Sequence, residues 1–401
     1  MSNVVEPTVS RRFELEIFLI SFAALLLEIS YTRLISFKLW YYYTYLVIGF
    51  ALLGIGSGGV LVSVFPRLAH VPLDRMVATG SLAASIAVAL GYLVVALLPT
   101  DTGRLWHEPG PEVAKLLLMC LALFASFLPV GVMISALLAR NPTRIARLYC
   151  ADLLGAGAAC AAVILLLRLL TPPGCILLAA LLLAALAGRL AWRRSLPLLA
   201  GSLAASAIFA AAVAFPEAIP EPVADASKAI RPETQRLFSA WDPVFRVDVT
   251  ESGSDSLRMV HHDGLAGAGL HRFDGDLGSL TRLERDPRSY AFRVTERPVG
   301  SVLIVGAAGG LEILTSLFFD ADQVTALELN SATVSLLTEH FADYSGHLAS
   351  NPRVRLVNTE ARSFLSREGG RYDLIYFVNP DSYSAQNAAT AGAFVLSESY
   401  L

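Results

Sequence analysis

The chain has 401 residues, of which 55% are hydrophobic and 16% charged, and its formal net charge is −3. Ordinary soluble domains are about 25% charged, so this composition excludes a wholly soluble chain of average type. Nucleic-acid-binding domains carry a strong basic excess, so we predict no nucleic-acid partner. The four cysteines lie in apolar segments and lack the spacing of metal ligands, so we also predict no metal.

The apolar excess lies before Pro216, in stretches long enough to cross a bilayer as helices, which takes about 18 apolar residues or more. We therefore predict a multi-pass helical domain at 1–215 with the lipid bilayer as its partner. The first stretch is too long for a cleaved signal peptide. The second is rich in glycine (Gly49, Gly54, Gly56, Gly58 and Gly59), which lets helices approach closely. The seven predicted spans are 13–36, 41–65, 76–98, 114–139, 146–170, 174–192 and 195–215.

Arginines fall on alternate connections between these spans, and the positive-inside rule makes those connections and the N-terminus cytoplasmic. With seven spans the C-terminal half would lie outside the cytoplasm, whereas a cytosolic nucleoside cofactor requires it inside. Either one segment does not span, 174–192 being the shortest, or the domain is not a cytosolic enzyme, and we favour the first. The expected location is a bacterial plasma membrane with the soluble domain in the cytoplasm.

Charged residues within the predicted spans are costly in a bilayer and usually face a partner or a wet cavity. Glu28 and Arg33 lie in the first span and Asp152 in the fifth. Two interpretations stay open. These residues line a path for a substrate or protons, or they lie near helix ends and pair for packing.

A Pro-rich, acidic stretch marks a linker, which we place at 216–238. A small β subdomain is predicted at 239–300, because FRVDVTE (245–251) alternates apolar and polar residues and LRMVHHDG (257–264) ends in an Asp-Gly turn signal. His261 and His262 are adjacent on the second strand and so point to opposite faces.

The segment 301–401 has the pattern of a Rossmann-type α/β domain. SVLIVGAAGGLEILTSLFF (301–319) predicts a strand, a small-residue turn and a helix, and QVTALELN (323–330) predicts a second strand. RVRLVNTEARSFL (353–365) and YDLIYFVNPDS (372–382) predict further strands. The predicted fold class is a multi-pass α-helical membrane bundle followed by a small β subdomain and an α/β Rossmann-type domain.

Polar and small residues follow each predicted strand, where open α/β sheets bind ligands. They are Gly306, Glu328, Glu360 and 379–381. A carboxylate about 20 residues after a glycine turn is placed to accept hydrogen bonds from ribose hydroxyls. The alternative is that these are ordinary turn and helix-capping residues.

These motifs resemble the spermidine synthase family of adenosylmethionine-dependent transferases over about 239–401. VLIVGAAGG, VTALELN, EARSFL and YDLIYFVNPDS each resemble a family motif, and LEISYTRLIS (27–36) and LYCADLLGAG (148–157) resemble its multi-pass form. The resemblance implies adenosylmethionine or its decarboxylated form as the nucleoside, with Glu328 on the ribose, Glu360 on the adenine and the glycine turn on the tail. It thereby gives the candidate cofactor-binding residues Gly306, Ala307, Gly309, Gly310, Glu328, Glu360, Ala361 and Asn379.

The sequence also departs from the family pattern on the acceptor side. Val378 stands where the family has its catalytic aspartate, and Gly309 replaces the aspartate of the glycine turn. DPRSYAF (286–292) keeps only part of another family motif, and Trp241–Asp242 replaces a Tyr-Gln pair. Asp381 and Tyr290 remain as the candidate catalytic residues.

Three functions are compatible with these features. The first is a membrane-bound transferase that moves an aminopropyl or methyl group to an amine, a polyamine or another acceptor. The second is a transporter or sensor that binds a polyamine or nucleoside without chemistry. The third, a dinucleotide oxidoreductase, is disfavoured because the turn lacks GxGxxG spacing. We expect the domain to be incomplete at its C-terminus, as in a fragment or a shortened protein, and a homo-oligomer is possible.

Overall fold

The computed structural model describes residues 13–231, 233–295 and 297–377. The chain divides into two compact units. The first contains the residues up to Lys38 together with Tyr43–Thr100 and Arg104–Val223. The second contains Leu39–Tyr42, Asp101–Gly103 and the residues from Ala224 onward. Two short segments between helices of the first unit are thus part of the second.

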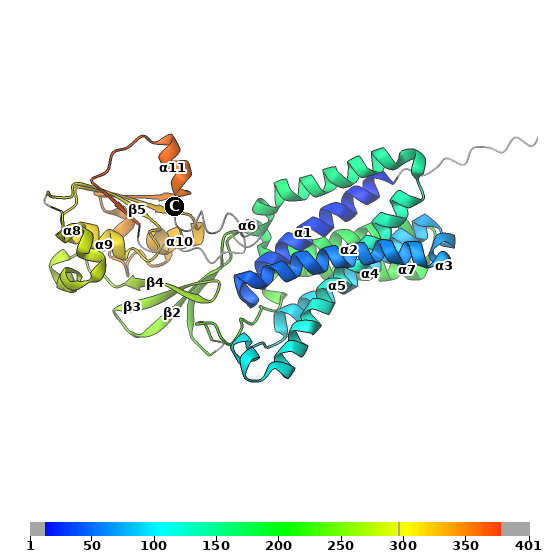
Figure 1. The fold of residues 1–401 in the computed structure, drawn as a ribbon, viewed down its shortest axis with the longest axis horizontal. Coiled ribbons are helices and arrows are strands. Elements are labelled where there is room, and N and C mark those ends of the chain that lie inside the picture. Colours follow the sequence, from blue (N-terminus) through cyan, green and yellow to red (C-terminus); the bar gives the residue numbers. More distant parts are fainter. Residues whose placement is uncertain (1–12, 232, 296, 378–401) are drawn as a thin grey trace, which may run out of the picture. The chain divides into compact units, whose positions relative to one another are not determined.

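The first unit is a bundle of helices (Figure 1). Within the described residues, six helices are long and apolar enough to cross a membrane, which agrees with the predicted integral membrane protein. The helices are α1 (Glu14–Lys38), α2 (Thr44–Val64), α3 (Pro66–His70), α4 (Leu73–Leu97), α5 (Pro109–Ala139), α6 (Ile145–Ala191) and α7 (Leu196–Ala214).

Helix α6 contains two of the predicted spans, and its backbone breaks at Thr171 (φ 61°, ψ 165°). Asp152 in its first half accepts a hydrogen bond from Ser21, and Arg189 in its second half pairs with Glu16 at 2.6 Å. Both partners lie near the start of α1, yet a straight helix would hold residues 152 and 189 roughly 55 Å apart. The chain therefore reverses at the break, and the second half packs along α1. This geometry favours seven membrane passes, with each half of α6 crossing once, over the six that remain if one predicted segment does not span.

The predicted glycine contacts in the bundle form at some positions only. A Cβ added to Gly58 would lie 2.3 Å from the Val132 nitrogen, and one added to Gly54 would lie 2.9 Å from the Phe124 carbonyl oxygen. Gly49 and Gly56 have nothing within 4 Å. Gly54 and Gly58 thus form the GxxxG face on which α2 packs against α5.

In the second unit, an antiparallel sheet follows the linker, in the order β1-β2-β3-β4. Asp263 and Gly264 both have positive φ (48° and 79°) and connect β3 to β4, which confirms the predicted Asp-Gly turn. The strands are β1 (Arg236–Ala240), β2 (Val247–Ser254), β3 (Leu257–His262) and β4 (Leu265–His271).

The second sheet is parallel, with the strand order β7-β6-β5-β8. In chain order this is 3-2-1-4, the arrangement of a doubly wound sheet, in which ligands bind where the order reverses. Buried side chains of both sheets share one core, with Val249 and Val260 from the first and Val302 and Ile304 from the second. The elements are α8 (Tyr290–Arg293), β5 (Ser301–Val305), α9 (Leu311–Phe318), β6 (Gln323–Glu328), α10 (Ser331–Ser335), β7 (Val354–Asn358), α11 (Ala361–Arg367) and β8 (Leu374–Tyr376).

Candidate functional site: a glycine turn and carboxylates at the strand ends

The glycine turn between β5 and α9 folds back onto the end of β6. The backbone N–H groups of Gly306 and Ala307 both donate to the Leu327 carbonyl oxygen, each at 2.9 Å. Gly306 (φ 84°), Ala308 (φ 42°) and Gly310 (φ 83°) all lie in the left-handed region. This backbone explains the small residues, because a left-handed conformation costs an L-residue roughly 1–2 kcal/mol.

Glu328 ends β6 and is held by backbone N–H groups on both sides. Its Oε2 accepts from Ala308 N and its Oε1 from Asn330 N, both at 2.9 Å. The side chain is 7% exposed. Burial raises the pKa of Glu328, while these hydrogen bonds act in the opposite direction without cancelling it. The structure thus brings together the glycine turn and the carboxylate, as predicted from their order in the sequence.

A second buried carboxylate, Asp242, lies near Glu328. Its Oδ2 accepts from the Ser331 hydroxyl at 2.5 Å and its Oδ1 from Val244 N at 2.9 Å. The negative charge of Asp242 adds to the rise in the pKa of Glu328. Two carboxylates near the end of β6 make this region rich in hydrogen-bond acceptors, which suits a ligand that presents hydroxyl or amine donors.

The structure gives Gly309 and Gly310 packing roles. A Cβ on Gly309 would lie 2.2 Å from the Gly269 carbonyl oxygen of β4, and one on Gly310 would lie 2.8 Å from the Leu348 side chain. Close approach of β4 therefore accounts for the glycine at 309. Contact of either glycine with a ligand stays a prediction.

Glu360 follows β7 and caps helix α11, whose first residue is Ala361. Its Oε1 accepts from Arg362 N at 2.9 Å and its Oε2 from Ser363 N at 2.8 Å. Partial burial alone raises the pKa of Glu360, but these hydrogen bonds outweigh it, and the pKa is lowered. Thr359 N donates to the Glu328 carbonyl oxygen at 3.0 Å, so the two strand ends are adjacent. Capping accounts for Glu360, and its role in adenine binding stays a prediction.

Of the two predicted catalytic residues, the structure describes Tyr290 but not Asp381. Tyr290 begins α8 with 66% of its surface exposed, and the structure gives it no contact with Glu328. Asn379 and Asp381, like Val378, lie outside the described residues. Asn330 was not among the predicted site residues, yet it caps α10 with its Oδ1 and donates from Nδ2 to the Phe245 carbonyl oxygen at 2.9 Å. The signal was available, since an asparagine before Ser-Ala-Thr is a typical helix N-cap.

Glu312, also missed, lies in the first turn of α9, directly after the glycine turn. Its Oε1 is 3.5 Å from the Arg288 Nε, and burial raises its pKa. The Arg288 carbonyl oxygen accepts from the Tyr376 hydroxyl at 2.6 Å. These contacts hold the segment that carries Asp286 and Tyr290 against α9 and β8.

The two histidines of β3 have separate partners, as their alternation predicts. His261 Nε2 lies 2.8 Å from the Thr250 hydroxyl, and the His262 ring lies 4.3 Å from the Phe245 ring. Within 13–231, 233–295 and 297–377, no group of three His, Cys, Asp or Glu side chains could hold a metal ion.

The protein should lose stability in acid through His262. Burial lowers the pKa of His262 from 6.5 to about 4. Between these two values the unfolded chain binds the proton and the folded chain does not, so the free energy of unfolding falls as the pH drops through this range. Denaturant unfolding at several pH values should show a shallower fall for His262→Phe than for wild type. Parallel curves for the two proteins would refute the assignment.

The comparisons with known proteins gave structural neighbours only. No family model and no curated protein matched the sequence. The crystal structure of spermidine synthase from Thermotoga maritima is similar at TM-score 0.28 and 16% identity, over 37% of this chain and 47% of that one. A spermidine synthase in complex with the transition-state analogue AdoDATO is similar at TM-score 0.28 and 15% identity, over 39% and 54%. The chain thus covers about half the length of each.

Proposed function

We propose that this protein is a membrane-anchored transferase whose second unit binds the nucleoside of adenosylmethionine or decarboxylated adenosylmethionine. The observation that carries the proposal is the buried Glu328 carboxylate at the end of β6, held between the glycine turn and Asn330. Each carboxylate oxygen accepts one backbone hydrogen bond and keeps a lone pair for a ribose hydroxyl.

The proposed pocket continues along the ends of the parallel strands. Glu360 follows the neighbouring strand, where its carboxylate oxygens can accept from the adenine amino group in addition to capping α11. The turn at Gly306 and Ala307 would lie against the tail that carries the sulfonium. Neutral hydroxyl and amine donors suit this acceptor-rich pocket, whereas a phosphate would meet the carboxylates of Glu328 and Asp242.

The transfer would proceed by direct displacement. A nucleophilic nitrogen of the acceptor attacks the carbon beside the sulfonium, the carbon–sulfur bond breaks, and its electron pair neutralises the sulfur. The attacking amine must be neutral, so a base has to accept its proton. We assign this role to Asp381 or Tyr290. The transferred group, aminopropyl or methyl, depends on which form of the nucleoside binds, and a polyamine is one candidate acceptor.

Calorimetry on the detergent-purified protein tests the proposal. We expect adenosylmethionine or its decarboxylated form to bind together with the product-like methylthioadenosine, since they share the adenosine moiety. Adenosine monophosphate is the matched control and should bind more weakly, because its phosphate meets the two carboxylates. The proposal fails if none of the three sulfur nucleosides binds to a protein that melts cooperatively.

A second candidate function is transport or sensing without chemistry. The hydrogen bond between Ser21 and Asp152 favours it, because it places a half-buried acidic side chain between α1 and α6. Polyamine flux into proteoliposomes that is lost on Asp152→Asn would support this candidate, and no flux with wild type would exclude it.

A further inference from the structure

The two ends of the helical bundle differ in charge. Side-chain contacts gather several chain segments at one end. Arg140 Nη1 donates to the Val71 carbonyl oxygen at 2.6 Å, Arg194 pairs with Asp74, and Arg189 pairs with Glu16. We call this the basic end. Its arginines are Arg67, Arg75, Arg140, Arg144, Arg147, Arg189, Arg193 and Arg194.

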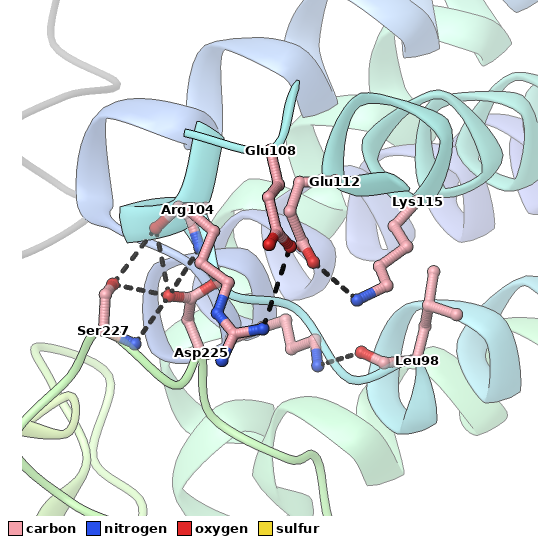
Figure 2. A network of polar contacts seen from close by, with 9 residues as sticks. Leu98, Arg104, Glu108, Glu112, Lys115, Asp225 and Ser227 are labelled. Carbon is pink, nitrogen blue, oxygen red and sulfur yellow. Dashed lines mark hydrogen bonds and ion pairs between the residues drawn. The ribbon is translucent and has the colours of Figure 1, made fainter. Parts of the chain in front are cut away.

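The buried Lys38 connects three chain segments at the opposite end of the bundle, which we call the polar end. Its Nζ donates to the carbonyl oxygens of Leu98, at 2.5 Å, and Val223, at 2.7 Å. The end of α1, the end of α4 and the segment after α7 therefore meet there. Two further basic residues of this end lie by acids, Arg104 at 4.0 Å from Glu108 and Lys115 at 2.7 Å from Glu112 (Figure 2). Besides these, Arg168 precedes the reversal of α6.

Two segments of the second unit continue directly from helices at the polar end. Thr102 donates to the buried Asp225 carboxylate from its N, at 3.0 Å, and from its hydroxyl, also at 3.0 Å. Trp40 Nε1 donates to the Ser227 hydroxyl at 3.0 Å. Ser227 N in turn donates to Asp225 at 3.0 Å (Figure 2). Thr102 follows α4 and Trp40 follows α1, so chain connectivity puts the second unit on the side of the membrane at which those helices end.

We infer that the basic end binds the anionic head groups of the cytoplasmic leaflet, and that the second unit lies on the opposite, non-cytoplasmic side. Each Lys or Arg near an anionic surface gains about 1 kcal/mol, so the eight arginines of the basic end, even with two of them paired to acids, outweigh the few basic residues of the polar end. The reversal inside α6 makes the number of membrane passes odd. The second unit therefore lies on the side of the membrane opposite to the start of α1, which belongs to the basic end. The pocket at Glu328 would then draw its nucleoside from outside the cytoplasm.

Cysteine accessibility in a bacterial host tests this orientation. Ser256→Cys places an exposed thiol on the second unit, and Thr143→Cys places one at the basic end. Both would be made with Cys150→Ala, because Cys150 is exposed near the basic end, and Cys150→Ala alone gives the background. With a membrane-impermeant maleimide, we expect intact cells to label Ser256→Cys at least 10-fold more than Thr143→Cys, each relative to permeabilised cells. The reverse pattern, or equal labelling of both, would overturn the inference.

Charge removal tests the cause of the orientation. The triple variant Arg67→Gln, Arg147→Gln, Arg193→Gln should lower the fraction of correctly oriented protein in the same assay. The matched control replaces three arginines of the second unit, Arg285, Arg293 and Arg367, and should change nothing. Unchanged orientation in the first variant would refute binding of the basic end to the anionic leaflet. Neither assay depends on nucleoside binding, so failure of the proposed function would leave this result in place.

Discussion

Glu328→Ala will weaken the binding of methylthioadenosine by about 10- to 100-fold, because hydrogen bonds to a charged group contribute about 1.5–3 kcal/mol. The carboxylate is buried and held in place by Ala308 N and Asn330 N, so little conformational freedom is lost when a ribose binds. Calorimetry measures the dissociation constant. Glu339→Ala, an exposed control eleven residues further along the chain, should bind like wild type.

The same substitution also leaves two backbone N–H groups without their acceptor, and this could disturb the turn. A 2′-deoxy form of methylthioadenosine separates the two effects. Wild type should bind it more weakly than the parent nucleoside, whereas Glu328→Ala should bind both alike, because the acceptor for the missing hydroxyl is gone. An equal preference for the parent nucleoside in wild type and variant would show that Glu328 does not contact the ribose.

Gly58→Ala will destabilise the bundle by about 3 kcal/mol, near the upper end for overpacked cores. The added methyl would lie 2.3 Å from Val132 N and 2.4 Å from the Gly131 carbonyl carbon, and backbone atoms cannot move aside as a flexible side chain can. Helices α2 and α5 would have to separate. The melting temperature in detergent and the yield of monodisperse protein report the loss.

Gly56→Ala is the matched control, because it lies on the same helix with nothing within 4 Å of an added Cβ. Alanine favours a helix over glycine by about 1 kcal/mol, so this variant should be as stable as wild type or slightly more stable. Equal losses for the two variants would mean that the GxxxG face does not determine the packing of α2 on α5.

The two proposals concern different halves of the protein, the ligand of the second unit and the orientation of the helical bundle. The proposed site at Glu328 would need a nucleoside, and by our inference the arginines of the bundle place that site on the non-cytoplasmic side. If both proposals hold, the nucleoside must be supplied outside the cytoplasm, by an earlier reaction that releases a sulfonium nucleoside there or by its export from the cell. Labelling and calorimetry on the same preparation would decide each half separately.

The sequence by itself determined the local features of this protein. Long apolar stretches predict spans, an Asp-Gly pair predicts the hairpin at 263–264, and a strand, small-residue turn, helix and strand predict the doubly wound sheet. These signals are local because periodicity, turn conformation and hydrophobic length act within a few residues. The pairing of Glu328 with the glycine turn was also predictable, since strand ends of a parallel sheet lie at one edge.

Contacts between distant residues were decided only by the tertiary structure. The sequence predicts two separate spans within α6, at 146–170 and 174–192, but only the contacts of Asp152 with Ser21 and of Arg189 with Glu16 show that both halves lie along α1. The sequence offered Gly309 only as a cofactor-binding candidate, and the structure adds a packing reason for the glycine, since an added Cβ would lie 2.2 Å from the Gly269 carbonyl oxygen of β4. Asp242 is far from Glu328 in sequence, and its charge adds to the rise that burial causes in the pKa of Glu328. Packing places such groups together, and packing depends on the whole chain.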